Sequence, residues 1–177
     1  KLRKVLLAGD GLVTVLTATR RILELNVMEE GVTSPFLHGF VPSITIAALD
    51  AASAQRLVSL APYSDETRER INSLTNRHPF LMQMLCKRLF DGESLDDAVK
   101  ALQADESLHH FFREDFRCLS VEQQECLLRI HADDPLEGGK TDEANALLSL
   151  GLIRRSGADL QIANSFLGRW LEKRNAA

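Results

Sequence analysis

The sequence lacks the features of membrane-spanning and of disulfide-bonded proteins. No stretch approaches the roughly 20 consecutive apolar residues that a membrane span requires. The opening segment KLRKVLLAGDGLVTVL is interrupted at Gly9, Asp10 and Gly11, unlike a signal peptide. The three cysteines are an odd number inside helical patterns, which favours reduced, packed thiols. These absences predict a cytoplasmic protein that makes no membrane contact.

The sequence also lacks the spacing of a metal site or of a catalytic centre. Cys118, Cys126 and His131 occur without a C-x-x-C or H-x-x-x-H pair. His109 and His110 are adjacent and would point to different sides of a helix. We therefore predict no metal ligands and no catalytic residues.

What is present is an ordinary globular composition. Of the 177 residues, 45% are hydrophobic and 26% are charged, enough for one large domain or two small ones. The chain begins with Lys1 rather than methionine, and we interpret it as a piece of a longer protein. The patterns predict a mainly α fold with some β structure.

The first half of the chain predicts two strands followed by a helical bundle. Leu12–Thr19 is almost continuously apolar and β-branched, as in a strand buried on both faces. A second short strand begins at Ser43 and leads to Asp50, a good helix N-cap. Helical apolar spacing then continues to Ala104.

The segment TNRHPFLMQMLCKRLF stands out within this bundle. Pro79 lacks the N–H that a helix start cannot satisfy, so it predicts the beginning of a helix. That helix is apolar on nearly all sides, with only a narrow polar stripe at Gln83 and Lys87. We expect Leu85 and Leu89 to be fully buried.

The last part of the chain has a different order of elements. Ser120 and Gln123 match a capping box, and a second helix is predicted over Thr141–Leu150. A hairpin around Ser156 follows, and then a final helix capped by Asn164. Helix, helix, hairpin, helix is the order of a winged helix domain.

With these elements placed, the chain resembles the C-terminal half of the STAND class of AAA+ P-loop ATPases. LRKVLLAGDGLVTVLTATR resembles the helix and strand that lead to the sensor-1 position, and ITIAALDAASAQRLV resembles the entry to the lid. LTNRHPFLMQMLCKRL resembles the lid helix with its Gly-x-Pro motif. LSVEQQECLLRI through GLIRRSGADLQIANSFLGRWLEK is similar to the winged helix that follows the lid.

The resemblance implies a domain organisation and a function. Residues 1–48 would be the C-terminal part of the nucleotide-binding α/β core, the helical lid would span 49–105, and the winged helix would span 106–177. The chain would be the regulatory part of an ATP-dependent switch, with a hinge near Ala104–Arg117. The full-length protein would bind ATP or ADP with Mg²⁺, and the lid and winged helix would serve a protein partner or self-assembly.

The resemblance also implies nucleotide-sensing residues. Pro79 occupies the motif position that lies against the nucleotide, next to His78, and Arg77 stands where the family usually has glycine. Further sensing candidates lie near the end of the first strand: Thr17, Thr19 and Arg20. The alternative interpretation is structural: a proline that starts a buried helix, and threonines that favour a strand.

The missing phosphate-binding motif limits what this chain does alone. Nucleotide hydrolysis needs G-x-x-x-x-G-K-[ST] and an acidic strand end, and the full motifs do not occur. We expect neither ATP hydrolysis nor a bound cofactor for the chain by itself. A nucleotide-independent helical interaction module therefore remains an alternative.

DNA binding is a further alternative that the charge disfavours. Residues 106–177 contain nine Lys/Arg and twelve Asp/Glu, a net charge of −3. Nucleic-acid affinity depends on cations placed against phosphates. We therefore expect a winged helix that contacts protein rather than nucleic acid.

Overall fold

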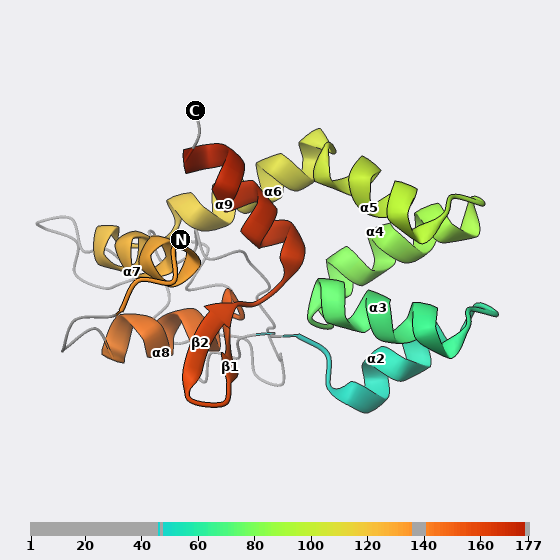
Figure 1. The fold of residues 1–177 in the computed structure, drawn as a ribbon, viewed down its shortest axis with the longest axis horizontal. Helices are drawn as coiled ribbons and strands as arrows, with labels where there is room; N and C mark the ends of the chain where they lie inside the picture. The colour runs from blue at the N-terminus through green and yellow to red at the C-terminus, as the bar shows by residue number, and fades with distance from the viewer. Residues whose placement is uncertain (1–45, 47, 136–140, 176–177) are drawn as a thin grey trace, which may run out of the picture. The chain divides into compact units, whose positions relative to one another are not determined.

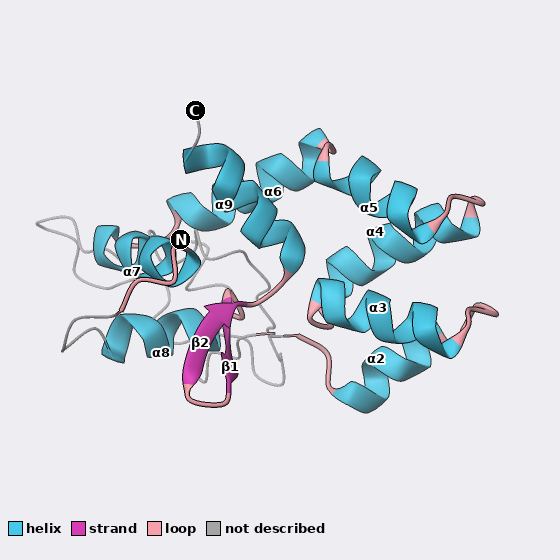
Figure 2. Ribbon diagram, viewed as in Figure 1, coloured by secondary structure: helices cyan, strands magenta, loops and turns pink. Residues whose placement is uncertain are grey.

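The computed structural model describes residues 46, 48–135 and 141–175. All of them belong to the unit Thr45–Ala177 into which contacts group this part of the chain. The described residues form eight helices and one small antiparallel sheet of two strands near the C-terminus (Figures 1 and 2). The mainly α prediction is thus confirmed, whereas the predicted strand Leu12–Thr19 lies outside the described residues.

Four helices form the bundle: α2 (Ala51–Val58), α3 (Asp65–Thr75), α4 (Pro79–Phe90) and α5 (Leu95–Gln103). Three of them begin at a side chain that accepts a backbone N–H, as the sequence predicts for α2 at Asp50. Asp50 caps α2, Ser64 caps α3 and Ser94 caps α5. Each cap satisfies a donor that has no partner within the helix.

The second predicted strand is not seen where the structure describes it. Ile46, Ala48 and Leu49 lie in irregular backbone before α2. The Leu49 N–H donates to the Arg77 carbonyl, 3.0 Å away in the α3–α4 turn. This donor is therefore used to hold the entry of the bundle against that turn rather than to pair with a strand.

Helix α4 is less buried than its apolar sequence predicts. Leu81, Met82 and Leu85 are fully buried. Leu89 is only partly buried, so the prediction that it is fully buried is wrong, and Phe90 is 82% exposed. The reason is that α4 packs against α2, α3 and α5, which cover one side of it and leave its end free.

The remaining elements form the C-terminal module: α6 (Glu106–Arg117), α7 (Val121–His131), α8 (Thr141–Ser149), β1 (Ile153–Ser156), β2 (Asp159–Ile162) and α9 (Ser165–Asn175). The predicted capping box at Ser120 and Gln123 is present, with both reciprocal hydrogen bonds. The hairpin pairs Ile153 with Ile162, and its turn contains Gly157 at φ 63°. The order helix, helix, hairpin, helix is confirmed from α7 to α9.

The last helix joins the bundle and the C-terminal module into one core. Helix α9 contacts α3 and α5 of the bundle, and α6, α7 and β2 of the module (Figure 1). Its apolar face is fully or almost fully buried and consists of Phe166, Leu167, Trp170 and Leu171. The start of α9 is fixed by Asn164, whose Oδ1 accepts the Leu167 N–H at 2.8 Å.

Candidate functional site

The α3–α4 turn, Asn76–Pro79, contains the predicted sensing residues that the structure describes. Asn76 and Arg77 both have left-handed backbone, with φ 46° and 59°. This conformation costs a non-glycine residue roughly 1–2 kcal/mol, although asparagine tolerates it better than most. Two such residues in succession make the turn a strained connection between two regular helices.

Pro79 is the first residue of α4, as predicted. His78 precedes it in extended backbone and makes no side-chain capping hydrogen bond. The N–H of His78 donates to the Thr75 carbonyl at 3.0 Å, and its carbonyl accepts the Met82 N–H at 2.9 Å. The backbone N–H and carbonyl of His78 are therefore both satisfied.

The imidazole of His78 is partly enclosed and incompletely paired. Its Nδ1 is buried and has no hydrogen-bond partner among the described residues. Its ring lies edge-on to the ring of Phe111 of α6, with 5.7 Å between centroids, and the ring of Phe80 lies 5.0 Å from that of Phe111. Burial lowers the pKa of His78 below its usual 6.5, because the charged form loses hydration there.

Arg77 is partly exposed and directly precedes His78 in the sequence. Within the described ranges, its guanidinium has no hydrogen bond or ion pair. Most arginines nearby are engaged: Arg70 pairs with Asp96 at 2.7 Å, and Arg88 pairs with Glu93 at 3.0 Å. Arg77 differs from these two arginines in having no ion pair among the described residues.

The structure brings Arg77, His78 and Pro79 together in one turn, as their order requires. Thr17, Thr19 and Arg20 lie outside the described residues. Sequence reasoning missed the contribution of Phe111, whose ring contacts His78, and of Phe80, whose ring packs against Phe111. The sequence marks Phe80, because it is an apolar residue directly after the helix-starting proline. It does not mark Phe111, which lies on α6, far from His78 along the chain.

Sequence reasoning also passed over a partial phosphate-loop match in front of α8. Gly139, Lys140 and Thr141 supply Gly-Lys-Thr, but Asp134 stands where the motif has its first glycine. The stretch follows helix α7 rather than a strand, and the next turn carries the acids Asp142 and Glu143. A phosphate loop follows a strand and leads into a helix start that attracts anions, so this match does not make one.

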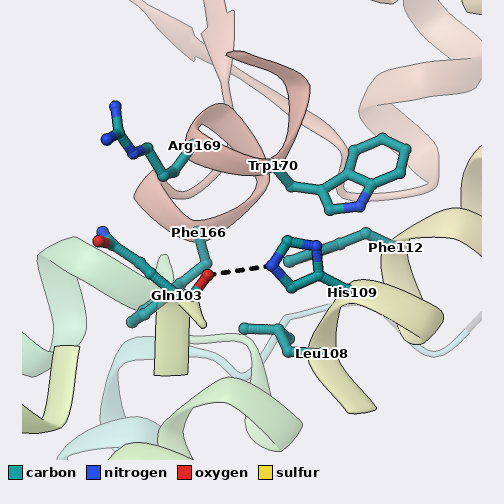
Figure 3. Close-up of a pocket in the computed structure, with 7 residues that line it drawn as sticks. All are labelled: Gln103, Leu108, His109, Phe112, Phe166, Arg169 and Trp170. Atoms are coloured by element: carbon teal, nitrogen blue, oxygen red, sulfur yellow. Dashed lines mark hydrogen bonds between the residues drawn. The ribbon is translucent and has the colours of Figure 1, made fainter. Parts of the chain in front are cut away.

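Two hollows on the described surface lie away from the α3–α4 turn. A cavity of about 10 Å³ separates α9 from the α5–α6 corner, where His109 Nε2 lies 3.0 Å from the Gln103 carbonyl (Figure 3). This volume holds at most one water molecule. A groove of about 620 Å³ runs between α3, α5, the hairpin and α9.

Neither a metal centre nor a membrane span is found in the described part of the chain. No three His, Cys, Asp or Glu side chains there come close enough to hold an ion. No helix among the same residues has the length and apolarity to cross a bilayer. Comparisons of the chain with protein-family models, with curated proteins and with solved structures found no match.

Proposed function

We propose that this chain is the regulatory portion of an ATP-dependent molecular switch of the STAND/AAA+ type. In this proposal α2–α5 form the helical lid, and α7–α9 with the hairpin form a winged helix. The α3–α4 turn reads the nucleotide, and the winged helix passes the signal to protein assembly in the full-length protein.

The observation that carries the proposal is the unsatisfied, strained α3–α4 turn. Arg77 has the positive φ that glycine adopts without cost, at the position where the family usually has glycine. His78, at the lid start, has a buried Nδ1 that finds no hydrogen-bond partner in the described part of the chain. Strain and unpaired polar atoms lower stability, and proteins retain them mainly where a ligand or a switch uses them.

The groups at this turn fit a nucleotide, although they do not suffice to hold one. Arg77 offers a guanidinium for a phosphate, and Pro79 with His78 offers an apolar edge and one polar atom for a base. The phosphate cradle and the Mg²⁺ ligands would belong to another part of the full-length protein. For this chain alone we expect no ATPase turnover and an ATP dissociation constant no tighter than about 1 mM.

The same turn is linked to the C-terminal helix. Leu74, two residues before Asn76, accepts a hydrogen bond at 3.0 Å from the Ser165 hydroxyl at the start of α9. A change in the turn therefore reaches α9 directly through the end of α3. This link supports a role in which the nucleotide state biases the position of the winged helix.

Protein contact is the output that the surface favours over DNA. Helix α8, the one most readily presented by a winged helix, begins with Asp142 and Glu143, which repel a phosphate backbone. By contrast, Leu60 is 84% exposed and Phe90 is 82% exposed on the bundle. We take these two side chains as candidate contacts for a protein partner or for self-assembly.

The experiment that tests this function compares two arginine variants of the full-length protein by fluorescent-ADP binding. Arg77→Ala removes the guanidinium but keeps a side chain at the left-handed position, so the turn remains strained. We expect about tenfold weaker ADP binding, the value of one charged hydrogen bond. Arg113→Ala, which removes an exposed arginine from α6, serves as the control. Equal affinity in both variants would remove the α3–α4 turn from the nucleotide site.

A further inference from the structure

One side of helix α9 faces the groove rather than the core. Its residues are three or four apart, the spacing of one helix face, and all of them line the groove of about 620 Å³: Ser165, Gly168, Arg169 and Glu172. The remaining lining comes from α3, the end of α5 and the hairpin. We call this hollow the α9 groove. Its volume lies within the roughly 300–1,000 Å³ of typical ligand sites.

The α9 groove has an apolar bottom and a polar rim. Of its lining residues, Ala163 is 2% exposed, and Leu74 and Ile162 are partly buried against the core. Side chains that form hydrogen bonds lie around them: Ser73, Gln103, Asn164 and Ser165. A binding site for a peptide combines these two features, apolar contact for side chains and polar groups that fix the main chain.

Cations surround the α9 groove. Arg154 of the hairpin and Arg169 of α9 line it, and the Lys173 ammonium donates at 2.9 Å to the last carbonyl of α5. Glu172 is the acid among the lining residues. Residues 151–177 contain five Lys/Arg and two Asp/Glu, a net charge of +3 in a chain whose net charge is −4. This local excess of positive charge is complementary to an acidic partner.

The two lining arginines are weakly engaged within the chain. Nη2 of Arg154 lies 3.4 Å from Oε1 of Gln161, which is long for a hydrogen bond. Arg169 pairs with Glu172 at 2.5 Å, but their side chains are 56% and 51% exposed, so the pair contributes little to stability. Figure 3 shows the Arg169 side chain pointing away from the ring of Trp170. Carboxylates of a partner can therefore bind both guanidinium groups.

Gly168 leaves space in the wall of the α9 groove. A glycine inside a helix is less favourable than an alanine. Among the described residues, a β-carbon at Gly168 would meet only Cγ2 of Ile162, at 3.9 Å, which is an ordinary contact. The packing of the chain therefore does not require glycine at this position. A missing side chain does allow another backbone to approach closely.

We propose that the α9 groove binds an extended segment of another protein that carries acidic and apolar residues. The apolar side chains of this segment contact Leu74 and Ile162, its carboxylates pair with Arg154 and Arg169, and its main chain passes Gly168. A nucleic acid matches the groove less well, because it brings no apolar side chains for the bottom. Any role of this contact as the output of a nucleotide switch rests on the proposed function, whereas the contact itself does not.

Fluorescence anisotropy of this chain without nucleotide tests the groove. The probe is a labelled heptapeptide of alternating Glu and Leu, and the matched probe has Lys in place of Glu. We expect saturable binding of the acidic probe alone. Arg154→Glu should weaken it at least about tenfold, as expected for a lost charged hydrogen bond. Arg113→Glu makes the same charge change at an exposed position of α6 and should weaken it less than about twofold.

A second variant separates binding from folding. Gly168→Leu places a side chain in the α9 groove beside Ile162. Leucine is a better helix former than glycine, so the melting temperature should stay the same or rise. Binding of the acidic probe should nevertheless weaken at least about tenfold, because the added side chain occupies the space of the peptide.

Four results would overturn the proposal. The first is no saturable binding of the acidic probe. The second is equal weakening by Arg154→Glu and Arg113→Glu, which would mean that net charge alone attracts the probe. Tighter binding of a labelled single-stranded DNA would make the groove a nucleic-acid site, and dimerisation that Arg154→Glu abolishes would make the occupant a second copy. Because no nucleotide is present, none of these results bears on the proposed function, which the Arg77 comparison tests.

Discussion

Two helices of this protein begin in opposite ways. Helix α7 begins at a complete capping box, in which Ser120 and Gln123 satisfy each other's backbone N–H groups. Helix α4 begins after two left-handed residues and without a side-chain cap, and the Nδ1 of His78 beside it has no partner among the residues that the structure describes. The start of α7 therefore stabilises the folded protein. The start of α4 has an energetic cost, and its contacts do not account for that cost.

The difference shows where local sequence rules fail in this molecule. Most described helix starts agree with their sequence signals, as expected when every local choice supports the fold. The α3–α4 turn departs from that agreement at Asn76, Arg77 and His78. Departures of this kind concentrate at functional sites, which is why the proposed function is placed there.

The largest expected loss of stability comes from a substitution in the body of α4, away from its start. Leu85 is fully buried, so Leu85→Ala should lower the free energy of unfolding by about 2–5 kcal/mol, through lost burial and a cavity. Leu89→Ala should cost less because Leu89 is partly exposed, and Gln83→Ala should cost least. Urea unfolding measures all three, and equal losses would mean that α4 faces another way.

At the start of α7, removing the cap should destabilise. Ser120→Ala deletes the oxygen that accepts the Gln123 N–H at 3.2 Å. We expect a loss of about 1 kcal/mol in the free energy of unfolding. Ser149→Ala, which removes an exposed hydroxyl bonded within its own helix, is the control and should change much less. If the free energy of unfolding of Ser120→Ala were unchanged, the start of α7 would not be stabilising and the contrast with α4 would disappear.

At the start of α4, a substitution should instead raise the free energy of unfolding. Arg77→Gly relieves the positive φ and should raise the free energy of unfolding by about 1 kcal/mol. Arg77→Ala keeps a β-carbon at the same φ and should bring no such gain. Thermal unfolding of the pair isolates backbone strain from charge, and a destabilised Arg77→Gly would show that the turn is not strained.

The His78 imidazole at the start of α4 should make the stability of the protein depend on pH. Burial lowers the pKa of His78 in the folded state, so the unfolded chain binds a proton more readily. The contribution of His78 to stability is complete above its pKa of 6.5 in the unfolded chain. It is lost as the pH falls through the pKa of His78 in the folded state. In urea unfolding at a series of pH values, His78→Gln should therefore lose less stability than the parent on acidification.

The sequence predicted local structure well and tertiary context less well. Pro79, the Ser120 capping box and the Asn164 cap act over three or four residues, so their patterns specify them. The burial of Leu89 and the backbone of Arg77 depend on which helices cover α4 and on how α3 ends, and the sequence does not show either.

The candidate site was predicted only in part, for the same reason. Arg77, His78 and Pro79 are adjacent in sequence, so one motif brought them together. Phe111 reaches His78 from α6, and Ser165 reaches Leu74 across 91 residues of chain. No local pattern marks such contacts, which depend on the packing of α6 and α9 against the bundle.

The most direct test of a nucleotide-reading turn is the rate of ADP release from full-length protein carrying Pro79→Ala. A proline at the first helical position lacks no needed hydrogen bond, so its loss should cost less than about 1 kcal/mol in stability. If the α4 start reads the nucleotide, ADP should leave measurably faster while the melting temperature stays nearly constant. Unchanged ADP release, with at most a shifted melting temperature, would show that Pro79 starts a helix and does nothing more.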